Sequence, residues 1–282
     1  MATSIKREVF SVFLRVFAVV LTIVLIFVVI GVSISSFTYI SDGECNVAVV
    51  PIEGVILPFS GLMDLGGLVI TPGGVQSYLD AVLDDSNIKA VLFEINSPGG
   101  TPVAAESITE LIRDYSLPTV ALIGDMGASG GYMVATGADR ILASRMSDVG
   151  GIGVTMSYVE ESIKNEEEGR TFVPLSTGRF KDAGNPDKPL TPEERALFEA
   201  QLEEIHDVFV SIVAENRSLD IEVVRGLATG ATMTGSSALE ARLIDGIGNR
   251  REAKATLAEL IGEGMSTEDI KYCEYNSYLT IL

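Results

Sequence analysis

A repeated order of buried strand, glycine-rich turn and helix is the feature of this chain that most limits its possible folds. The apolar run 90–95 leads into a Ser-Pro-Gly-Gly turn at 97–100, and residues 103–114 then have helical character. The same order recurs where the apolar run 119–123 leads to Gly127–Gly131 and a further helical run. Short apolar strands that alternate with helices indicate a mostly parallel, covered sheet. We therefore predict an α/β fold with both glycine-rich turns at its carboxyl edge, where such sheets bind ligands.

The rest of the chain extends this pattern. The apolar run Val47–Ile52 predicts a further buried strand. Thr191 followed by proline is a favourable helix start, and apolar residues mark one helix face through to about Asn216. Additional helices are predicted at residues 75–84, 236–241 and 251–261. Because no repeat or low-complexity linker divides the sequence, we predict one domain at 42–264 and a loosely attached C-terminal tail at 265–282.

A long apolar segment lies near the N-terminus. From Val16 to Ile34 nearly every residue is apolar, and no charged residue occurs between Arg15 and Asp42. A helix of roughly 20 apolar residues crosses a ~30 Å hydrocarbon core, whereas the apolar part of a cleaved signal peptide is shorter. Basic residues precede the segment and acidic residues follow it, which places the N-terminus in the cytoplasm. We predict that residues 1–41 are a cytoplasmic N-terminus and a single-pass transmembrane helix in the plasma membrane, with the remainder extracytoplasmic.

The region after this segment is strongly acidic. The first 41 residues contain three of the 20 basic and one of the 39 acidic side chains, which leaves 17 basic against 38 acidic. Such a charge disfavours binding to nucleic acids, so we expect no nucleic-acid partner. The sequence contains no Cys-x-x-Cys or His-Glu-x-x-His spacing, and we therefore predict no metal site.

The chain has two cysteines, Cys45 and Cys273. An oxidising exterior would permit a disulfide between them. Two cysteines near opposite ends of a region are nevertheless more typical of free thiols, and we expect them to be free.

Ser129 stands in Gly127–Gly131 among residues with almost no side chain. A serine hydroxyl is a weak nucleophile at neutral pH and needs a base beside it. At the start of a helix it also lies near unpaired backbone N–H groups, which can bind the oxyanion of a tetrahedral intermediate. The N–H of Gly130 and the turn at 98–100 offer candidate donors. A tight turn without chemistry explains the same residues, so the serine alone does not establish a function.

Lys181 is the candidate base, because the chain contains only one histidine. A free lysine has a pKa of ~10.4, whereas a base near neutral pH works best at about 7–8. Burial away from water lowers the pKa of a lysine, as does a positive neighbour such as Arg179, while a negative neighbour such as Asp182 opposes the change. An exposed loop lysine without chemistry is the alternative.

Two other arrangements also occur in the sequence. Ser129, Asp182 and His206 follow the chain order of an α/β-hydrolase triad, which would make the protein an esterase or a related hydrolase. His206, however, lies inside a long helical pattern, whereas a triad histidine normally lies on a loop. Ser86 and Lys89 form a Ser-x-x-Lys sequence that a helix-ending turn explains.

Taken together, the motifs of this chain resemble those of the signal peptide peptidase A family. The motifs that carry the resemblance are, in chain order, Asn96–Gly100, Ala128–Tyr132, Ala138–Ile141, Gly150–Val154, Gly178–Lys181 and Ala238–Asp245. The match runs from about Val47 to Ala258. Each motif alone is weak, but their order is specific.

The resemblance implies a ClpP/crotonase-like α/β domain that acts as a membrane-anchored serine endopeptidase. By matching positions, it implies Ser129 as the nucleophile, Lys181 as the base, and Gly100 and Gly130 as oxyanion donors. It implies that no cofactor is needed and that the substrates are remnant signal peptides and other apolar segments. It further implies a homo-oligomer in which the lysine of one subunit can reach the serine of its neighbour.

One residue departs from the family pattern. The family usually has serine at the position of Gly151, and that serine hydrogen-bonds the catalytic lysine. Gly151 cannot form this bond, so a water or another hydroxyl replaces it, or the base is less well oriented. A non-catalytic, membrane-anchored assembly protein is therefore a third interpretation, besides the peptidase and the esterase.

Overall fold

The computed structural model describes residues 14–26, 45–59, 69–262 and 264–274. Residues 14–26 form a helix with exposed side chains, and this helix belongs to a different unit from Gly43–Glu274. Within the described ranges, no helix has both the length and the apolar character needed to cross a membrane. The predicted anchor at 16–34 lies partly outside the described residues and stays a prediction.

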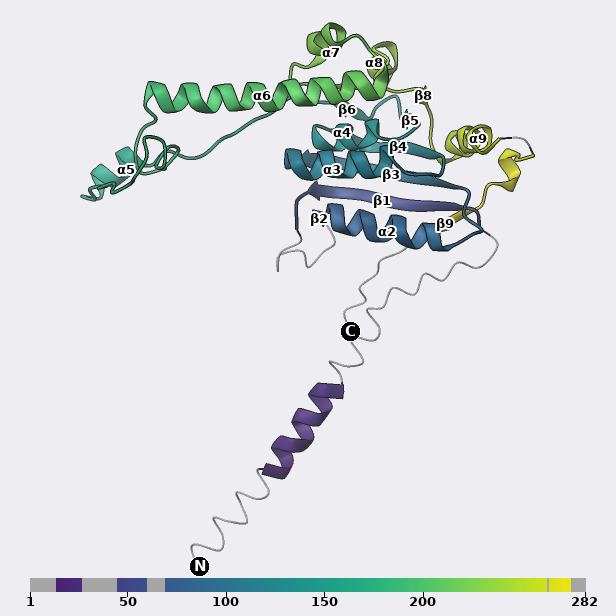
Figure 1. Cartoon of the computed structure of the whole chain (residues 1–282), viewed down its shortest axis with the longest axis horizontal. Coiled ribbons are helices and arrows are strands. Elements are labelled where there is room, and N and C mark those ends of the chain that lie inside the picture. The colour runs from purple at the N-terminus through teal and green to yellow at the C-terminus, as the bar shows by residue number, and fades with distance from the viewer. Residues whose placement is uncertain (1–13, 27–44, 60–68, 263, 275–282) are drawn as a thin grey trace, which may run out of the picture. The chain divides into compact units, whose positions relative to one another are not determined.

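The unit Gly43–Glu274 is organised around one sheet (Figure 1). Its strands are β1 (Val47–Ile56), β2 (Val69–Ile70), β3 (Ala90–Gly100), β4 (Thr119–Ala128), β5 (Arg140–Ala143), β6 (Asp148–Gly150), β7 (Thr232–Thr234), β8 (Gly246–Ile247) and β9 (Tyr272–Glu274). The strand order is β2-β1-β3-β4-β5-β8, with β9 beside β1, β6 beside β4 and β7 beside β6. The β6–β7 pair is antiparallel and the other pairs are parallel. This confirms the predicted α/β fold with a mostly parallel sheet.

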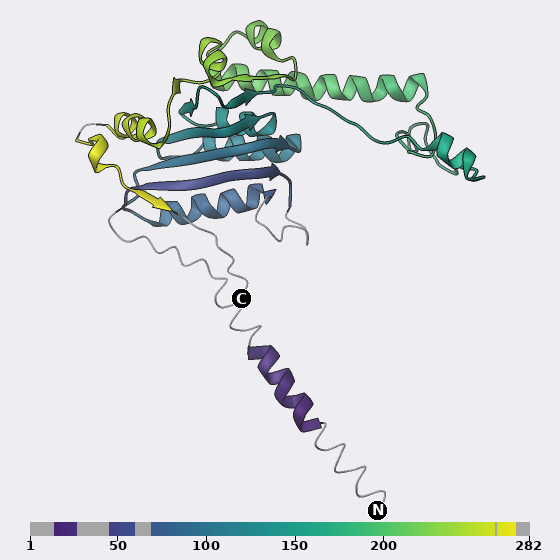
Figure 2. The same cartoon turned by 180° about the vertical axis from the view of Figure 1, so that it is seen from behind.

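Helices cover both faces of the sheet (Figures 1 and 2). They are α2 (Pro72–Asp84), α3 (Pro102–Arg113), α4 (Gly130–Thr136), α5 (Ser162–Glu167), α6 (Pro192–Arg217), α7 (Ile221–Leu227), α8 (Gly235–Glu240) and α9 (Arg250–Ile261), with a short 3-10 helix at Thr267–Asp269. Helix α3 packs against both α2 and α4, and all three helices pack on the central strands. On α9, Ala253 and Leu257 pack with alternate strand residues such as Val49 and Leu92. Consecutive residues of these strands are therefore buried, which explains their continuous apolar runs.

The two glycine-rich segments continue the strands, although we predicted a turn at each. Gly99 belongs to β3 because it pairs with Val55 of β1. Gly127 belongs to β4 because it pairs with Ser97 of β3. These pairings place both segments at the same edge of the sheet, on neighbouring strands.

The C-terminal residues are tied to the start of β1, contrary to two expectations. Cys45 and Cys273, which we expected to be free, form a disulfide and are both buried. The predicted loose tail at 265–282 includes β9, which pairs with β1 and is therefore part of the sheet. The Asn46 side chain supports this pairing, since it accepts from the N–H of Lys271 at 2.9 Å. The two cysteines are separated by 228 residues in sequence, and only the completed sheet brings them together.

Residues 154–191, here called the arm, leave the sheet after β6 and return through α6. Figures 1 and 2 show α5, within the arm, beyond the end of α6 that is remote from the sheet. The start of α6 has the predicted cap: Thr191 Oγ1 accepts from Glu194 N at 3.2 Å, and the Glu194 carboxylate accepts from Thr191 N at 2.9 Å. At its other end, Asn216 of α6 donates to Thr136 of α4 at 3.0 Å. The arm is therefore attached to the first residues of α6, and the last residues of α6 are hydrogen-bonded to the core through Asn216.

Candidate active site

Ser129 occupies a sharp bend between β4 and α4. Its φ of 52° and ψ of −125° are unusual for a residue with a side chain, and such strain is typical of nucleophile elbows. Hydrogen bonds hold the bend from both sides. Ser129 N donates to Gly150 O at 2.7 Å, and Ser129 O accepts from the N–H groups of Tyr132 and Met133 at 3.0 Å each. The backbone therefore fixes the position from which the hydroxyl projects.

The two predicted oxyanion donors lie beside one another. A Cβ built on Gly130 would lie 3.3 Å from Gly100 N, and a Cβ built on Gly99 would lie 2.6 Å from Gly130 N. A side chain at position 99 would therefore crowd the Gly130 N–H, and the φ of 98° at Gly99 also favours glycine. Two backbone N–H groups so close to a nucleophile can accommodate the oxygen of a carbonyl under attack.

Ser97 also belongs to this site, although its hydrogen-bonding role was not predicted from the sequence. Its side chain is fully buried. Its Oγ donates to Gly54 O at 2.7 Å and accepts from Gly99 N at 3.1 Å. These two bonds hold the backbone that leads to Gly100. The only sequence signal for this role is its position in the Asn96–Gly100 motif.

Two further motif residues, Tyr132 and Asp139, hold the helix and the strand that flank Ser129. Tyr132 of α4 is fully buried and donates its hydroxyl to Leu243 O at 2.7 Å. Burial raises the pKa of the Tyr132 hydroxyl well above its ordinary value, so the group stays protonated and keeps this bond. Asp139 accepts from the N–H and the hydroxyl of Thr119, at 2.8 and 2.9 Å, and so fixes the start of β4. These two residues position the strand and the helix on either side of Ser129.

Gly151 also lies next to Ser129. A Cβ built on Gly151 would lie 3.3 Å from Ser129 N and 3.2 Å from the Cγ2 methyl of Thr232. Thr232 belongs to β7 and pairs with Gly150 of β6. No sequence motif marks Thr232, because its place beside the serine depends on the pairing of two three-residue strands.

Lys181 lies in the arm and is exposed. Its N–H donates to Gly178 O at 3.3 Å. The preceding Arg179 forms an ion pair with Glu193 at 2.5 Å, which ties this turn to the start of α6. Among the described residues, no hydrogen bond links Ser129 to Lys181, and both views show the arm extending away from the sheet (Figures 1 and 2). One chain by itself therefore does not join the predicted nucleophile and base.

The alternative triad is not assembled either. Asp182 lies in the arm, where one carboxylate oxygen accepts from Asn185 at 3.1 Å and the other is buried without a hydrogen-bond partner in the described structure. His206 lies in the middle of α6, as its helical pattern predicted. In the described part of the chain, neither residue hydrogen-bonds to Ser129.

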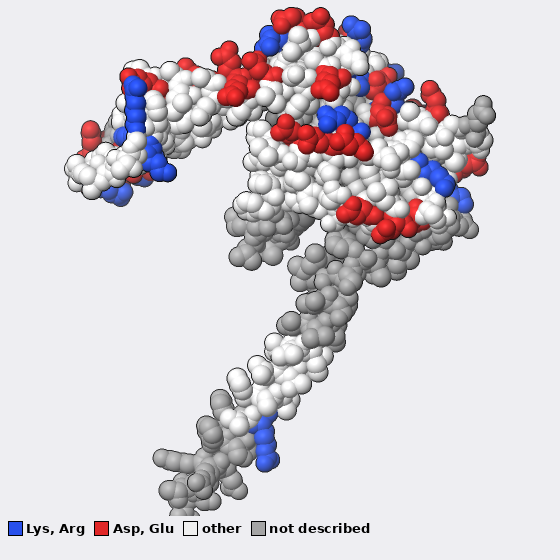
Figure 3. Space-filling view, viewed as in Figure 1, with Lys and Arg blue, Asp and Glu red and all other residues white. Residues whose placement is uncertain are grey.

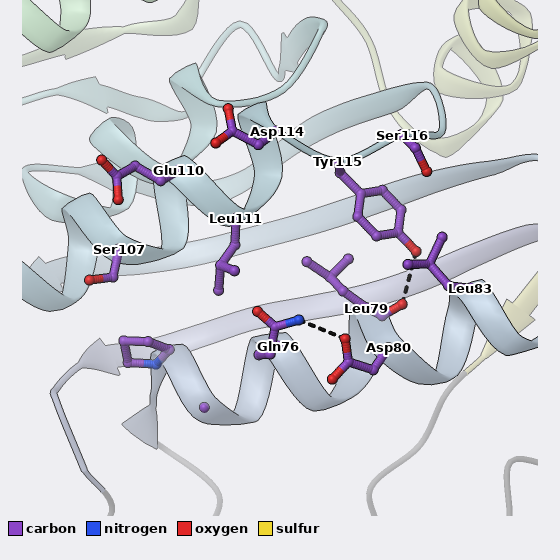
Figure 4. A pocket seen from close by; sticks show the side chains of 12 residues that line it. Gln76, Leu79, Asp80, Leu83, Ser107, Glu110, Leu111, Asp114, Tyr115 and Ser116 are labelled. Atoms are coloured by element: carbon purple, nitrogen blue, oxygen red, sulfur yellow. Dashed lines mark hydrogen bonds between the residues drawn. The ribbon is translucent and has the colours of Figure 1, made fainter.

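A shallow groove of about 780 Å³ lies between α2 and α3, apart from these residues (Figure 4). Its lining includes the apolar Leu79 and Leu111 and the acidic Asp80 and Glu110. None of the residues predicted for catalysis lines it. The catalytic interpretation therefore depends on the backbone geometry around Ser129 and not on this groove.

Acidic side chains are spread over the face of the molecule drawn in Figure 3, with basic side chains among them. The described part of that face carries no continuous basic surface. This distribution agrees with the acidic composition and differs from that of a surface that binds a phosphate backbone.

Comparison with known proteins identifies relatives of this chain. The profile of peptidase family S49 matches residues 112–263. The chain is 34% identical over 197 residues to a Synechocystis sp. protein and 33% identical over 184 residues to a Methanocaldococcus jannaschii protein, both of which carry provisional protease names. It is also 33% identical over 182 residues to an Enterococcus faecium protein provisionally named signal peptide peptidase SppA.

These three matches cover 68%, 64% and 64% of this chain, respectively. They cover 71% of the Synechocystis protein, 59% of the Methanocaldococcus protein and 53% of the Enterococcus protein. The chain thus spans little more than half of two of these relatives. The family profile includes Ser129, Gly130, Gly151 and Lys181 and matches more than half of the chain. The chain belongs to peptidase family S49.

Proposed function

We propose that this protein is a serine endopeptidase of the signal peptide peptidase type, which cleaves apolar peptides through an acyl-enzyme. The observation that carries the proposal is the strained bend at Ser129 beside the backbone N–H groups of Gly100 and Gly130. A hydroxyl held there can attack a carbonyl carbon while the two N–H groups stabilise the oxyanion. Membership of peptidase family S49 supports the same chemistry.

The base in this proposal is Lys181 of a neighbouring copy of the chain. Its neutral amine takes the proton of Ser129 Oγ as that oxygen bonds to the carbonyl carbon. The amine then gives the proton to the leaving nitrogen, and water hydrolyses the resulting ester with the same lysine as base. The exposed position of Lys181, on an arm that extends away from its own sheet, supports a partnership between chains. No metal or cofactor takes part in these steps.

We also propose that the peptidase unit lies outside the cytoplasm, anchored to the plasma membrane by residues 16–34. The disulfide between Cys45 and Cys273 supports this location, because disulfides persist mainly in oxidising compartments. The substrates would be remnant signal peptides and other apolar segments released near the membrane. The acidic surface supports peptides over nucleic acids as partners.

A covalent serine probe and an apolar peptide substrate test this proposal on the full chain. The wild-type protein should be labelled at Ser129 and should cleave the peptide. Lys181→Ala should lower turnover by about 10²- to 10⁴-fold, the usual contribution of a general base. His206→Ala is the matched control and should remain active.

The opposite result for the two variants would favour the esterase built from Ser129, Asp182 and His206. A correctly assembled wild-type chain that is neither labelled nor active would favour the non-catalytic assembly protein. Either outcome would overturn the proposed serine–lysine peptidase.

A further inference from the structure

A lysine that serves as a general base needs a partner that orients it. A neutral amine has one lone pair and two N–H groups, and only the lone pair can accept the serine proton. In activated nucleophiles, a third group usually holds the base in the productive direction. This inference rests on the proposed function and asks which group of this chain holds the incoming Lys181 amine.

Gly151 stands between Ser129 and Thr232, where a side chain would be crowded and would need the left-handed φ of 62°. A Cβ there would contact Ser129 N at 3.3 Å and the Thr232 methyl at 3.2 Å. Thr232 and Ser129 therefore both border the small space next to Gly151. A hydroxyl that points into this space lies near the nucleophile without belonging to its own segment of chain.

The Thr232 hydroxyl is available for such a role. Its only hydrogen-bond partner in the described structure is Asp148, at 3.5 Å, well beyond the 2.5–3.0 Å of ordinary O–H···O bonds. A rotation of about 120° about χ1, from one staggered rotamer to another, moves the hydroxyl to the present position of the methyl group. Thr232 is also exposed, so a residue that arrives from another chain can reach it.

The other hydroxyls near Ser129 are engaged or enclosed. Ser97 Oγ is buried and already donates to Gly54 O and accepts from Gly99 N. The Tyr132 hydroxyl is buried and donates to Leu243 O. Thr101 Oγ1 has no hydrogen-bond partner in the described structure but is buried, and Thr101 follows the proposed oxyanion donor Gly100 in the chain. Of these groups, Thr232 alone combines exposure with a weakly engaged hydroxyl.

We infer that Thr232 is the positioning residue for the catalytic lysine and replaces, from the neighbouring strand, the side chain that Gly151 lacks. Thr232 Oγ1 accepts one N–H of the Lys181 amine, which turns the nitrogen lone pair toward Ser129 Oγ. The serine proton moves to that nitrogen and later to the leaving amine. Thr232 keeps its own proton throughout and never contacts the substrate carbonyl.

Isosteric substitution of Thr232 in the assembled full-length protein tests the inference. Thr232→Val keeps the branched shape and removes the hydroxyl, so kcat for an apolar peptide should fall by about 10- to 100-fold while KM changes by less than about twofold. Thr232→Ser keeps the hydroxyl and should remain within about threefold of wild type. Thr229→Val, an exposed threonine three residues earlier, is the matched control and should be neutral.

A hydroxyl swap provides the sharper comparison. Thr232→Ala removes the group, and Gly151→Ser in that background returns a hydroxyl beside the same space. Because any side chain at Gly151 needs the left-handed φ of 62° and lies 3.3 Å from Ser129 N, the reference is Thr232→Ala/Gly151→Ala, which carries the same strain without the hydroxyl. The variant with serine at 151 should exceed this reference by at least about tenfold in kcat. A merely structural role for Thr232 predicts no such difference.

The outcomes separate this inference from the proposed function. Unchanged kcat in Thr232→Val, a loss that Thr232→Ser shares, or a Thr232→Ala/Gly151→Ser variant no better than Thr232→Ala/Gly151→Ala would each overturn the role of Thr232. In each of these cases wild-type cleavage and its dependence on Lys181 would persist. A wild-type protein that cleaves no peptide would overturn the proposed function, and the inference with it.

Discussion

Ser129 and Lys181 lie in two regions of the molecule that differ in how far their side chains are buried. Around Ser129 the chain is enclosed, and every residue of α4 is buried. Around Lys181 the chain is open: Val173 and Leu175 are 69% and 95% exposed, and Lys181 is itself exposed. The nucleophile is therefore preorganised within each chain, whereas the arm lacks the dry surroundings that a lysine base requires.

The difference shows which half of the site depends on assembly. Besides Val173 and Leu175, the arm exposes the apolar Val159 and Ile163, at 76% and 69%. Monomeric proteins rarely leave many large apolar groups uncovered in one region. A second chain that covers the arm would bury these side chains and would dehydrate the amine of Lys181. This reasoning supports the proposal that base and nucleophile come from different subunits.

The largest expected effect comes from mixing two inactive chains. Lys181→Ala should lose about 10²- to 10⁴-fold in turnover, and Ser129→Ala, which removes the nucleophile, should lose at least as much. When the two are co-expressed, a site between subunits can combine the intact serine of one chain with the intact lysine of the other, so about a quarter of the sites should be restored. Peptide hydrolysis by oligomers that carry both affinity tags is the measurement. Mixed oligomers without activity would place both residues of the dyad in one chain.

The second prediction concerns the enclosed half alone. Gly99→Ala should lower kcat by about 10²- to 10³-fold, the usual cost of losing one oxyanion donor, because a Cβ there lies 2.6 Å from Gly130 N. Gly73→Ala is the matched control, since a Cβ on Gly73 has nothing within 4 Å. Thermal unfolding should show that the Gly99→Ala protein is folded. Near-normal kcat in folded Gly99→Ala would exclude Gly130 N as an oxyanion donor.

The enclosed region was also the more predictable from sequence. The apolar runs that became β1, β3 and β4 follow from local patterns. In the arm, the cap at Thr191 was predictable in the same way. Sequence did not predict that β3 and β4 continue through their glycines, because this depends on pairs such as Val55 with Gly99, formed between distant segments. The strands β6, β7 and β8 were missed for a related reason, since two or three residues carry no periodicity.

For the site, sequence supplied candidate residues but not their arrangement. Ser129 and its glycines could be found because small residues at a bend leave a local pattern. Lys181 could be named by its motif, and an exposed loop was one interpretation of it, but no local pattern predicted an arm that extends away from the sheet. Thr232 was missed entirely, because its proximity to Gly151 arises from strand pairing between segments far apart in the chain.

The third prediction tests how the C-terminal strand is held on the enclosed unit. The double variant Cys45→Ser/Cys273→Ser should lose about 2–5 kcal/mol of unfolding free energy, the usual effect of removing a native disulfide. The bond joins positions 228 residues apart and therefore restricts the unfolded chain strongly. Urea unfolding with and without reductant is the measurement. Identical midpoints for the wild type under both conditions would show that the disulfide does not form. Activity per folded molecule should change little, because neither cysteine lies near Ser129 in the sheet.

The smallest expected effect concerns the start of α6, where the arm joins its helix. Glu194 accepts from Lys188 Nζ at 2.6 Å and from Thr191 N at 2.9 Å, and these bonds lower the pKa of its carboxyl below the usual value. Because the folded-state pKa is the lower one, the carboxylate stabilises this helix start above the ordinary glutamate pKa of about 4.3. The contribution is lost as pH falls through the lowered folded-state value.

Hydrogen exchange at the first turn of α6 measures this effect. After correction for intrinsic rates, opening should increase on acidification below about pH 4 in the wild type. Glu194→Gln should already open more readily at neutral pH and should lose the pH dependence. Glu199→Gln is the matched control, because Glu199 is exposed and lies 3.6 Å from Arg195, its ion-pair partner in the described structure. Equal pH dependence in wild type and Glu194→Gln would mean that the arm is held mainly by its other contacts, such as the ion pair of Arg179 with Glu193.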